Sequence, residues 1–316
     1  MKQARQQQLT TVLSLPTGSQ ETLAELAGSF KRHLEAENKR PRTVQGYLEV
    51  LTAFRSYLDA EQMPQEVGSL HREHVEAFIA DLLTRAKPAT ALNRFSALQQ
   101  FFKWALSEDL VVRSPMEKMQ RPKAPVQPAD ILREDDLRRV IRACEGSDFR
   151  DRRDSALVFF LLDTGCRLDE TTRLDVEDVD LDNGTATVLG KGGRRRMVGL
   201  GRKTLRVLDR YLRARRAQSH AHDAGLWLGP KGRMTNSGIA QALEHRGKLA
   251  ELKHRLHPHA FRHTWAHLMK MAGVSQEETM ALAGWQSPQM MMRYAASTAT
   301  ERALATHKLH SPGDRL

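Results

Sequence analysis

The chain has little cysteine and no long hydrophobic run. Only two of its 316 residues are cysteines, Cys144 and Cys166, which excludes a small secreted scaffold held by disulfides. The N-terminal stretch MKQARQQQLTTVLSL has neither the apolar core nor the small-residue cleavage site of a signal peptide. No uncharged apolar stretch approaches the roughly 18 residues of a membrane-spanning helix, and the mean hydropathy is -0.53. We therefore expect a soluble cytoplasmic protein with two free thiols and no membrane partner.

Acidic residues are outnumbered by basic ones. Lys and Arg total 49 against 38 Asp and Glu, so the formal net charge is +11 at pH 7. Such a charge favours a polyanionic partner, although charge alone does not separate DNA from RNA or a membrane surface. A basic, well-solvated surface without such a partner is the alternative at this point.

Proline is scarce, at 12 residues, yet several prolines fall in one short stretch. They are Pro115, Pro122, Pro125 and Pro128. Because proline blocks helix and biases its predecessor toward extended backbone, this stretch predicts a semi-rigid connector. At roughly 100–200 residues per domain, the length fits one domain on either side. We predict an N-terminal extension (1–18), a helical domain (19–110), a linker (111–129) and a larger domain (130–316).

Upstream of the linker, apolar residues recur at helical spacing. The periodicity predicts helices that start near residues 23 and 41 and two more over 71–86 and 89–110, which together form a small bundle. Basic side chains near the ends of these helices could reach phosphates. The candidates are Arg40, Arg42, Lys87 and Arg94. An ordinary solvated helix surface explains them equally well.

Downstream of the linker, the pattern is mixed. Helical periodicity predicts helices over 133–146, 151–165, 202–218, 236–252, 259–273 and 275–285. Between 181 and 201, β-branched residues alternate with polar ones on both sides of the turn GKGG, which predicts two short strands. The predicted fold class is therefore mainly α with a small antiparallel β-sheet.

Two local patterns in the larger domain hold basic residues. In TGCRLDE, Arg167 follows an apolar helix, and Glu170 lies one helical turn further on, where it can orient the arginine or cap the backbone. Lys191 is flanked by glycines at the hairpin tip, so its side chain can project onto a phosphate, and it is followed by Arg194, Arg195 and Arg196. Taken singly, a structural ion pair and an exposed hairpin tip explain these patterns as well.

Two further patterns lie closer to the C-terminus. His259 and Arg262 are three residues apart on a predicted helix, so both side chains can face one phosphate. Trp285 in LAGW is followed nine residues later by Tyr294, after a run of methionines. On their own, an exposed His and Arg and a packing tyrosine are the simpler interpretations.

In this order, the patterns resemble the catalytic domain of the tyrosine recombinases, the phage integrase family with its Xer- and Cre-type members. That family's pattern is Arg, Lys, His-x-x-Arg, His or Trp, and a nucleophilic Tyr nine residues later. The matching residues are Arg167, Lys191, His259, Arg262, Trp285 and Tyr294. The motifs cover roughly 129–310, whereas 19–107 resembles the family's SAM-like helical core-binding domain only in general character. Histidine is more common at position 285; an indole N–H can still donate to phosphate, but it cannot exchange a proton.

The resemblance implies a site-specific recombinase that cuts and rejoins duplex DNA for integration, excision or resolution. It implies a 3′-phosphotyrosyl intermediate on Tyr294 and no metal, ATP or other cofactor. Arg167, Arg262 and Trp285 would stabilise the phosphate, His259 would act as base, and Lys191 would protonate the leaving 5′-oxygen. We assign Glu170 and His263 to support. The implied partners are a specific double-stranded core site and three further protomers on two synapsed sites, near the nucleoid, with accessory proteins in some members.

Other interpretations stay open. His254, His257, His259, His263 and His267 are close enough in sequence to consider zinc, but no HExxH glutamate accompanies them, so we expect no metal. A non-catalytic DNA-binding protein would be expected to have lost part of the residue set. A type IB topoisomerase shares the chemistry but acts as a monomer. The sequence leaves open the target site and the choice between a mobile-element integrase and a chromosome-dimer resolvase.

Overall fold

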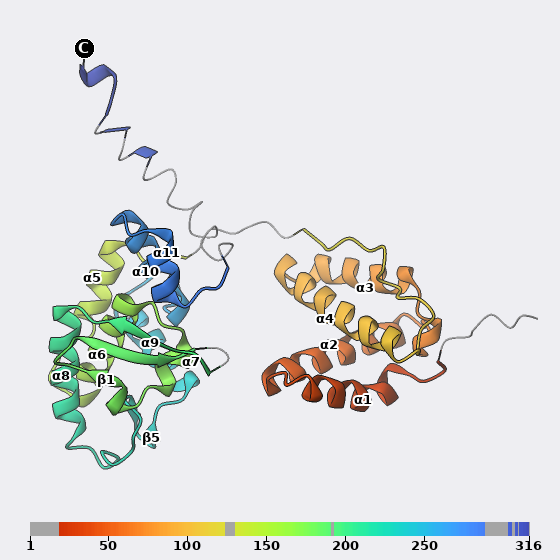
Figure 1. Ribbon diagram of the computed structural model, residues 1–316, viewed down its shortest axis with the longest axis horizontal. Helices are drawn as coiled ribbons and strands as arrows, with labels where there is room; N and C mark the ends of the chain where they lie inside the picture. Colours follow the sequence, from red (N-terminus) through yellow and green to blue (C-terminus); the bar gives the residue numbers. More distant parts are fainter. Residues whose placement is uncertain are drawn as a thin grey trace, which may run out of the picture. The chain divides into compact units, whose positions relative to one another are not determined.

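The computed structural model describes residues 19–123, 130–190, 193–287, 303–304, 307–308 and 310–315. The chain divides into two compact units, with the division between Pro125 and Val126 (Figure 1). Each unit has its own hydrophobic core. Among the helices in these described ranges, none is both long and apolar enough to cross a membrane.

In its described residues, the N-terminal unit consists of four α-helices and a short 3-10 turn. The helices are α1 (Leu23–Ala36), α2 (Pro41–Ala60), α3 (Arg72–Arg85) and α4 (Pro88–Ser107), with the turn at Val67–Ser69. The rings of Phe30, Phe54, Phe78 and Phe101 are fully buried between them, which confirms the bundle that the apolar spacing predicts.

The helices α2 and α4 begin in the same way. Each has proline at its first turn, where the missing N–H costs no hydrogen bond, and each has a basic N-cap residue, Arg40 or Lys87. Neither N-cap side chain makes a capping hydrogen bond. Both basic side chains are exposed at a helix N-terminus.

The first part of the predicted linker is not an extended connector. Val111 and Met116 are buried in the core of the N-terminal unit, and Met119 packs against it. A turn over residues 115–118 turns Met116 inward, and Arg121 donates a hydrogen bond to the Ser96 hydroxyl at 3.1 Å. The prediction of an extended, semi-rigid connector is therefore wrong for residues 113–119, because proline spacing does not report the burial of the apolar residues between the prolines.

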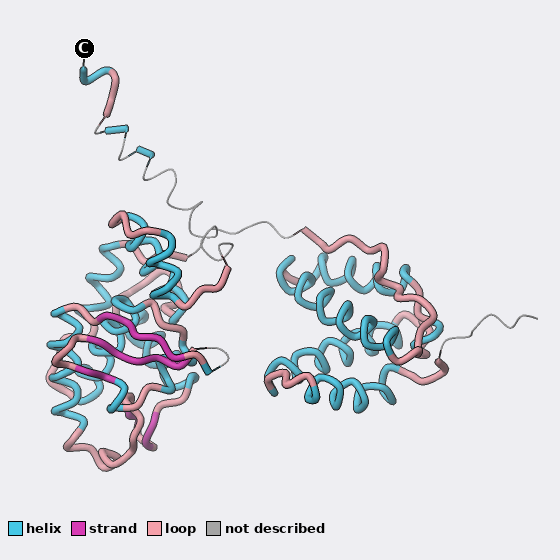
Figure 2. Tube along the Cα trace, in the orientation of Figure 1, coloured by secondary structure: helices cyan, strands magenta, loops and turns pink. Residues whose placement is uncertain are grey.

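The C-terminal unit combines helices with a small antiparallel sheet, which buries Ala186, Val188 and Val198 on one face. Strands β1 (Val179–Asp180), β2 (Thr185–Leu189) and β3 (Arg195–Gly199) form this sheet in the order β1-β2-β3 (Figure 2). The two-residue strands β4 (Leu228–Gly229) and β5 (Gly232–Arg233) pair separately. The predicted hairpin is therefore present as β2 and β3. Strands β1, β4 and β5 are present as well, although the sequence pattern does not predict them.

The helices of this unit pack around α6. They are α5 (Glu134–Arg142), α6 (Phe149–Thr164), α7 (Leu168–Arg173), α8 (Arg202–Arg215), α9 (Asn236–Leu249), α10 (Pro258–Met271) and α11 (Gln276–Ala283). The helix α6 packs against α8, α9 and α10, and its residues Ala156, Leu157 and Phe160 are fully buried. These elements confirm a mainly helical fold with a small antiparallel sheet.

A buried charge network ties α6 to α9. Both oxygens of the Asp154 carboxylate accept hydrogen bonds, one from Arg153 and one from Arg246, at 2.8 Å each. Arg246 also donates to Asp151 and to the Ala143 carbonyl. Because every charge is paired, the network can lie in the interior.

Candidate active site

The candidate site begins where α6 ends. Gly165 takes the left-handed conformation, with φ of 58°, and closes the helix by donating its N–H to the Leu161 carbonyl. A Cβ at Gly165 would lie 2.5 Å from ring atoms of Trp265 on α10, so only glycine fits there. This close approach brings the start of α7 next to α10.

Arg167 is the N-cap residue of α7 and is held by Glu170 one turn later. The backbone N–H of Arg167 donates to Glu170 Oε2 at 2.9 Å, and its Nη1 donates to Oε1 at 2.8 Å. The Arg167 side chain is 34% exposed, whereas that of Glu170 is only 3% exposed. Glu170 therefore both orients Arg167 and caps its backbone, the two contacts that their spacing predicts.

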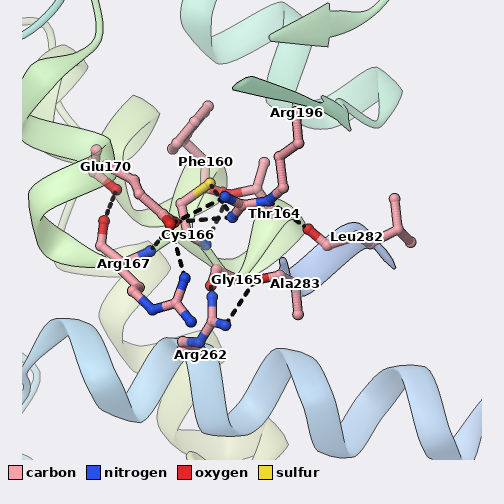
Figure 3. Close-up of polar contacts among 11 residues, drawn as sticks. Phe160, Thr164, Gly165, Cys166, Arg167, Glu170, Arg196, Arg262, Leu282 and Ala283 are labelled. Atoms are coloured by element: carbon pink, nitrogen blue, oxygen red, sulfur yellow. Dashed lines mark hydrogen bonds and ion pairs between the residues drawn. The ribbon is translucent and has the colours of Figure 1, made fainter. Parts of the chain in front are cut away.

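The buried Glu170 carboxylate also binds Arg196 of β3 (Figure 3). Nη1 and Nη2 of Arg196 donate to Oε1 and Oε2 at 3.0 and 2.9 Å. Burial alone raises the pKa of Glu170, but the hydrogen bonds from Arg196 and Arg167 outweigh it and hold the pKa at about 2. The carboxylate is therefore charged across the physiological range.

Arg262 on α10 is anchored at two places. Its Nη1 donates to the Gly165 carbonyl at 2.6 Å, and its Nη2 donates to the Ala283 carbonyl at 2.9 Å (Figure 3). The residue is 3% exposed. Because Ala283 is the last residue of α11, its carbonyl lacks an intrahelical partner, and a guanidinium suits that negative helix end.

Trp285 lies directly after α11 and against Arg262. The guanidinium carbon of Arg262 is 5.0 Å from the centroid of the Trp285 ring, a cation–π distance. Trp265 meets Trp285 edge to face, with ring centroids 6.4 Å apart. Gly284, with φ of 63°, lets the chain turn from α11 into Trp285. Trp285 is thus fixed by an arginine on one side and a tryptophan on another.

His259 and His263 lie on successive turns at the start of α10, with ring centroids 6.2 Å apart. Partial burial lowers the pKa of His259, and the nearby charges of His257, Arg262 and Arg167 lower it further. The ring is therefore neutral at pH 7 and can accept a proton. His257 is the N-cap residue of α10, and its Nδ1 accepts the Ala260 N–H.

A pocket of about 730 Å³ opens between the β2–β3 hairpin and the end of α11. Its lining includes Arg167, Arg194, Arg195, Arg196 and Trp285. A pocket with several guanidinium groups and an indole suits a phosphate better than an uncharged or cationic ligand.

Two predicted residues, Lys191 and Tyr294, lie outside the described residues. In the described part of the hairpin, the Gly190 N–H donates to the Arg194 carbonyl at 2.8 Å. The site that the structure brings together therefore consists of Arg167, Glu170, His259, His263, Arg262 and Trp285.

The predicted DNA-binding residues fall into two sets. Arg40, Arg42, Lys87 and Arg94 belong to the N-terminal unit, where Arg94 is half-buried and the others are exposed. Arg194 and Arg195 are exposed and line the pocket of the C-terminal unit.

The two cysteines are buried packing residues rather than reactive thiols. Cys144 and Cys166 are both free and buried. Burial raises the pKa of Cys166 to about 11, which makes it an inert thiol rather than a redox switch. Within the described part of the chain, no group of three or more His, Cys, Asp or Glu side chains could hold a metal ion.

The sequence patterns assign no role in the site to two residues that shape it, Arg196 and Trp265. Arg196 lies on the same face of β3 as the buried Val198, because side chains two apart along a strand point the same way. That alternation is present in RRMVG and separates Arg196 from Arg195. Trp265 follows Phe261 at a four-residue step on the buried face of α10, which predicts burial but not its contact with Gly165.

Known proteins share this arrangement of elements. The sequence model of the phage integrase family matches residues 130–301, and the model of the phage integrase N-terminal SAM-like domain matches residues 26–111. The tyrosine recombinase XerC of Myxococcus xanthus is 28% identical over 285 residues, which cover 88% of this chain and 94% of XerC.

Two solved structures show the same fold. The XerH site-specific recombinase bound to a palindromic difH substrate matches with a TM-score of 0.73 at 18% identity, covering 92% of this chain and 85% of XerH. A lambda integrase tetramer bound to a Holliday junction matches with a TM-score of 0.70 at 16% identity, covering 88% and 78%. With its two units and both family models matched in order, the chain belongs to the phage integrase family, the tyrosine recombinases that cut and rejoin DNA at specific sites.

Proposed function

We propose that this recombinase binds the scissile phosphate with Arg167, Arg262 and Trp285 and attacks it with Tyr294. The observation that carries the assignment is that Arg167 and Trp285 line one pocket, while Arg262 lies against the Trp285 ring and binds the Gly165 carbonyl, two residues before Arg167. The arginines come from separate elements, the start of α7 and the first turns of α10.

Anchoring matters for the chemistry because the transition state carries more negative charge on its equatorial oxygens than the ground state does. Arg167 is held by Glu170, and Arg262 is held by two backbone carbonyls, so neither has to reorganise as that charge develops. Removing one such donor from a preorganised site costs about 10²- to 10³-fold in rate.

The proton steps fall to His259 and Lys191. A phenol has a pKa of about 10, so Tyr294 needs a base, and His259 is neutral and able to accept the proton. The Tyr294 oxygen forms a bond to phosphorus while the bond to the 5′-oxygen breaks, and Lys191 supplies the proton that this oxygen takes up. A 5′-hydroxyl reverses these steps to rejoin a strand, and the phosphotyrosyl bond conserves the energy.

The double-stranded core site would be held by both units. The exposed N-termini of α2 and α4 carry Arg40 and Lys87 and have no side-chain cap, so the basic side chains and the positive helix ends both favour a phosphate there. The lambda integrase tetramer on a Holliday junction supports a synaptic assembly of four protomers on two sites. We place the enzyme in the cytoplasm, at the nucleoid.

Covalent trapping tests the proposal. The protein is incubated with sheared DNA from its own host and denatured with SDS, and protein-linked fragments are recovered and sequenced. We expect wild type and the control Tyr57→Phe, a tyrosine in the N-terminal unit, to yield fragments that end at one site. Tyr294→Phe should yield none. Adducts that persist in Tyr294→Phe, or DNA binding without adducts in wild type, would contradict the proposal.

A further inference from the structure

We infer that Arg196 is a positioning residue of the active site, which fixes Arg167 through Glu170 and the end of α11 through Leu282. The inference rests on the proposed function, because it concerns how the phosphate-binding groups are held. Arg196 itself is directed into the protein. Its Nε, Nη1 and Nη2 each donate to a protein acceptor, and its side chain is 14% exposed.

Arg196 and Arg167 together hold the Glu170 carboxylate. The carboxylate accepts four hydrogen bonds, and each oxygen receives one from Arg196 and one from Arg167. Arg196 approaches as a two-pronged fork, which sets the plane of the carboxylate as well as its place. Without Arg196, a carboxylate that is 3% exposed would keep only the Arg167 donors and could rotate toward other partners. Arg167 would then lose the fixed carboxylate that orients its guanidinium.

Arg196 also contacts the C-terminal end of α11. Nε of Arg196 donates to the Leu282 carbonyl at 2.9 Å, and the next carbonyl, of Ala283, accepts from Arg262. Two guanidinium groups therefore occupy successive carbonyls of the last helical turn, which lack intrahelical partners. A Cβ at Gly284 would lie 3.3 Å from the Arg196 side chain, so Arg196 also packs closely against the turn that leads into Trp285.

These contacts form one chain from Arg167 through Glu170 and Arg196 to the α11 segment that Arg262 holds (Figure 3). Only an arginine spans it. Its planar fork binds both carboxylate oxygens while Nε points in a different direction, whereas a lysine offers a single nitrogen. A lysine at position 196 would therefore keep the charge and lose the positioning.

The kinetic test uses Arg196→Lys and Arg196→Met, with Arg213→Met as the matched control. Arg213 also pairs with a carboxylate, that of Asp209 at 2.8 Å, but its side chain is 62% exposed on α8. The single-turnover rate of covalent attachment is measured with saturating enzyme on a nicked duplex of the trapped site. We expect both Arg196 variants to be about 10- to 100-fold slower, with DNA affinity within about twofold of wild type. Arg213→Met should match wild type.

A double-mutant cycle separates positioning from general loss of structure. If Arg196 acts partly through Arg167, then Arg196→Met should slow an Arg167→Ala enzyme by a smaller factor than it slows wild type, and the loss that remains measures the contact with Leu282. An equal loss in both backgrounds would overturn the inference, as would wild-type rates in Arg196→Lys. Circular dichroism and the melting temperature of each variant report whether it folds.

A second measurement is independent of DNA. The ¹⁵N relaxation of the Arg167 Nε–H group, assigned with Arg167→Lys, reports how firmly the guanidinium is held. We expect a rigid signal in wild type and Arg213→Met and a mobile one in Arg196→Met. Should wild type form no adduct on any DNA, the proposed function fails, and this signal still decides the role of Arg196. An Arg167 group that stays rigid in Arg196→Met would overturn the inference.

Discussion

The Arg262 guanidinium lies over the face of the Trp285 ring, with 5.0 Å from its central carbon to the ring centroid. The same guanidinium donates to carbonyls at the end of α6 and the end of α11. Trp285 is therefore placed by the residue with which it would share the phosphate. Because Arg262 and Trp285 are in contact, a substitution at position 285 can change both the stacking on the guanidinium and the hydrogen bonding to the phosphate.

Replacing Trp285 separates stacking from hydrogen bonding. Trp285→Phe keeps an aromatic face for Arg262 but removes the N–H, so we expect attachment to be about 10- to 100-fold slower with little change in DNA affinity. Trp285→His retains an N–H donor and should lose less activity than the phenylalanine variant. Single-turnover rates on the trapped site measure both. A phenylalanine variant as fast as wild type would contradict a role for the indole N–H.

Acid stability should report the buried Glu170. Its pKa is about 2 in the folded protein and lies near 4.5 when unperturbed, so the unfolded state binds the proton more readily. The stabilisation that its charge provides is therefore complete above about pH 4.5 and is lost as the pH falls toward 2. Urea unfolding at pH 3 and pH 6 should show a smaller difference for Glu170→Gln than for wild type. Glu134→Gln, at a carboxylate that is 77% exposed, should behave as wild type.

Gly165 should be intolerant of any side chain. Gly165→Ala adds strain at a positive φ and a clash with the Trp265 ring, which together cost about 2–4 kcal/mol of unfolding free energy. The matched control is Gly273→Ala, with φ of 80° and no atom within 4 Å of the added Cβ, where strain alone costs about 1 kcal/mol. Equal losses in denaturant unfolding would show that contact with Trp265 does not matter.

The pH dependence of attachment should follow His259. Because its pKa is lowered, the neutral base is present at pH 7, and the rate should fall only as the pH drops through a value below 6.5. Single-turnover rates between pH 5 and pH 9 would reveal this acid limb. His259→Gln should be slower throughout and should lack the limb. A midpoint above 6.5 in wild type, or an unchanged limb in the variant, would assign the proton transfer elsewhere.

Local spacing predicts most helices and the contact between Arg167 and Glu170, because both depend on residues within a few positions of each other. The alternation in RRMVG separates Arg196 from Arg195, but the role of Arg196 depends on a carbonyl 86 residues away, which local spacing does not predict. The short helix α7 has too few residues to show a period. The burial of Met116 comes from tertiary packing, which proline spacing does not report. The features that local spacing does not predict are mainly those that depend on contacts between residues far apart in the sequence.

The identity of the nucleophile is tested most directly by mass spectrometry of the trapped adduct. After nuclease and trypsin digestion, the account predicts that a nucleotide remnant is attached to the peptide of residues 294–302, which begins with Tyr294. Fragmentation should place it on the phenolic oxygen. A remnant on any other residue, or a peptide 294–302 that is always unmodified while adducts form, would contradict the account.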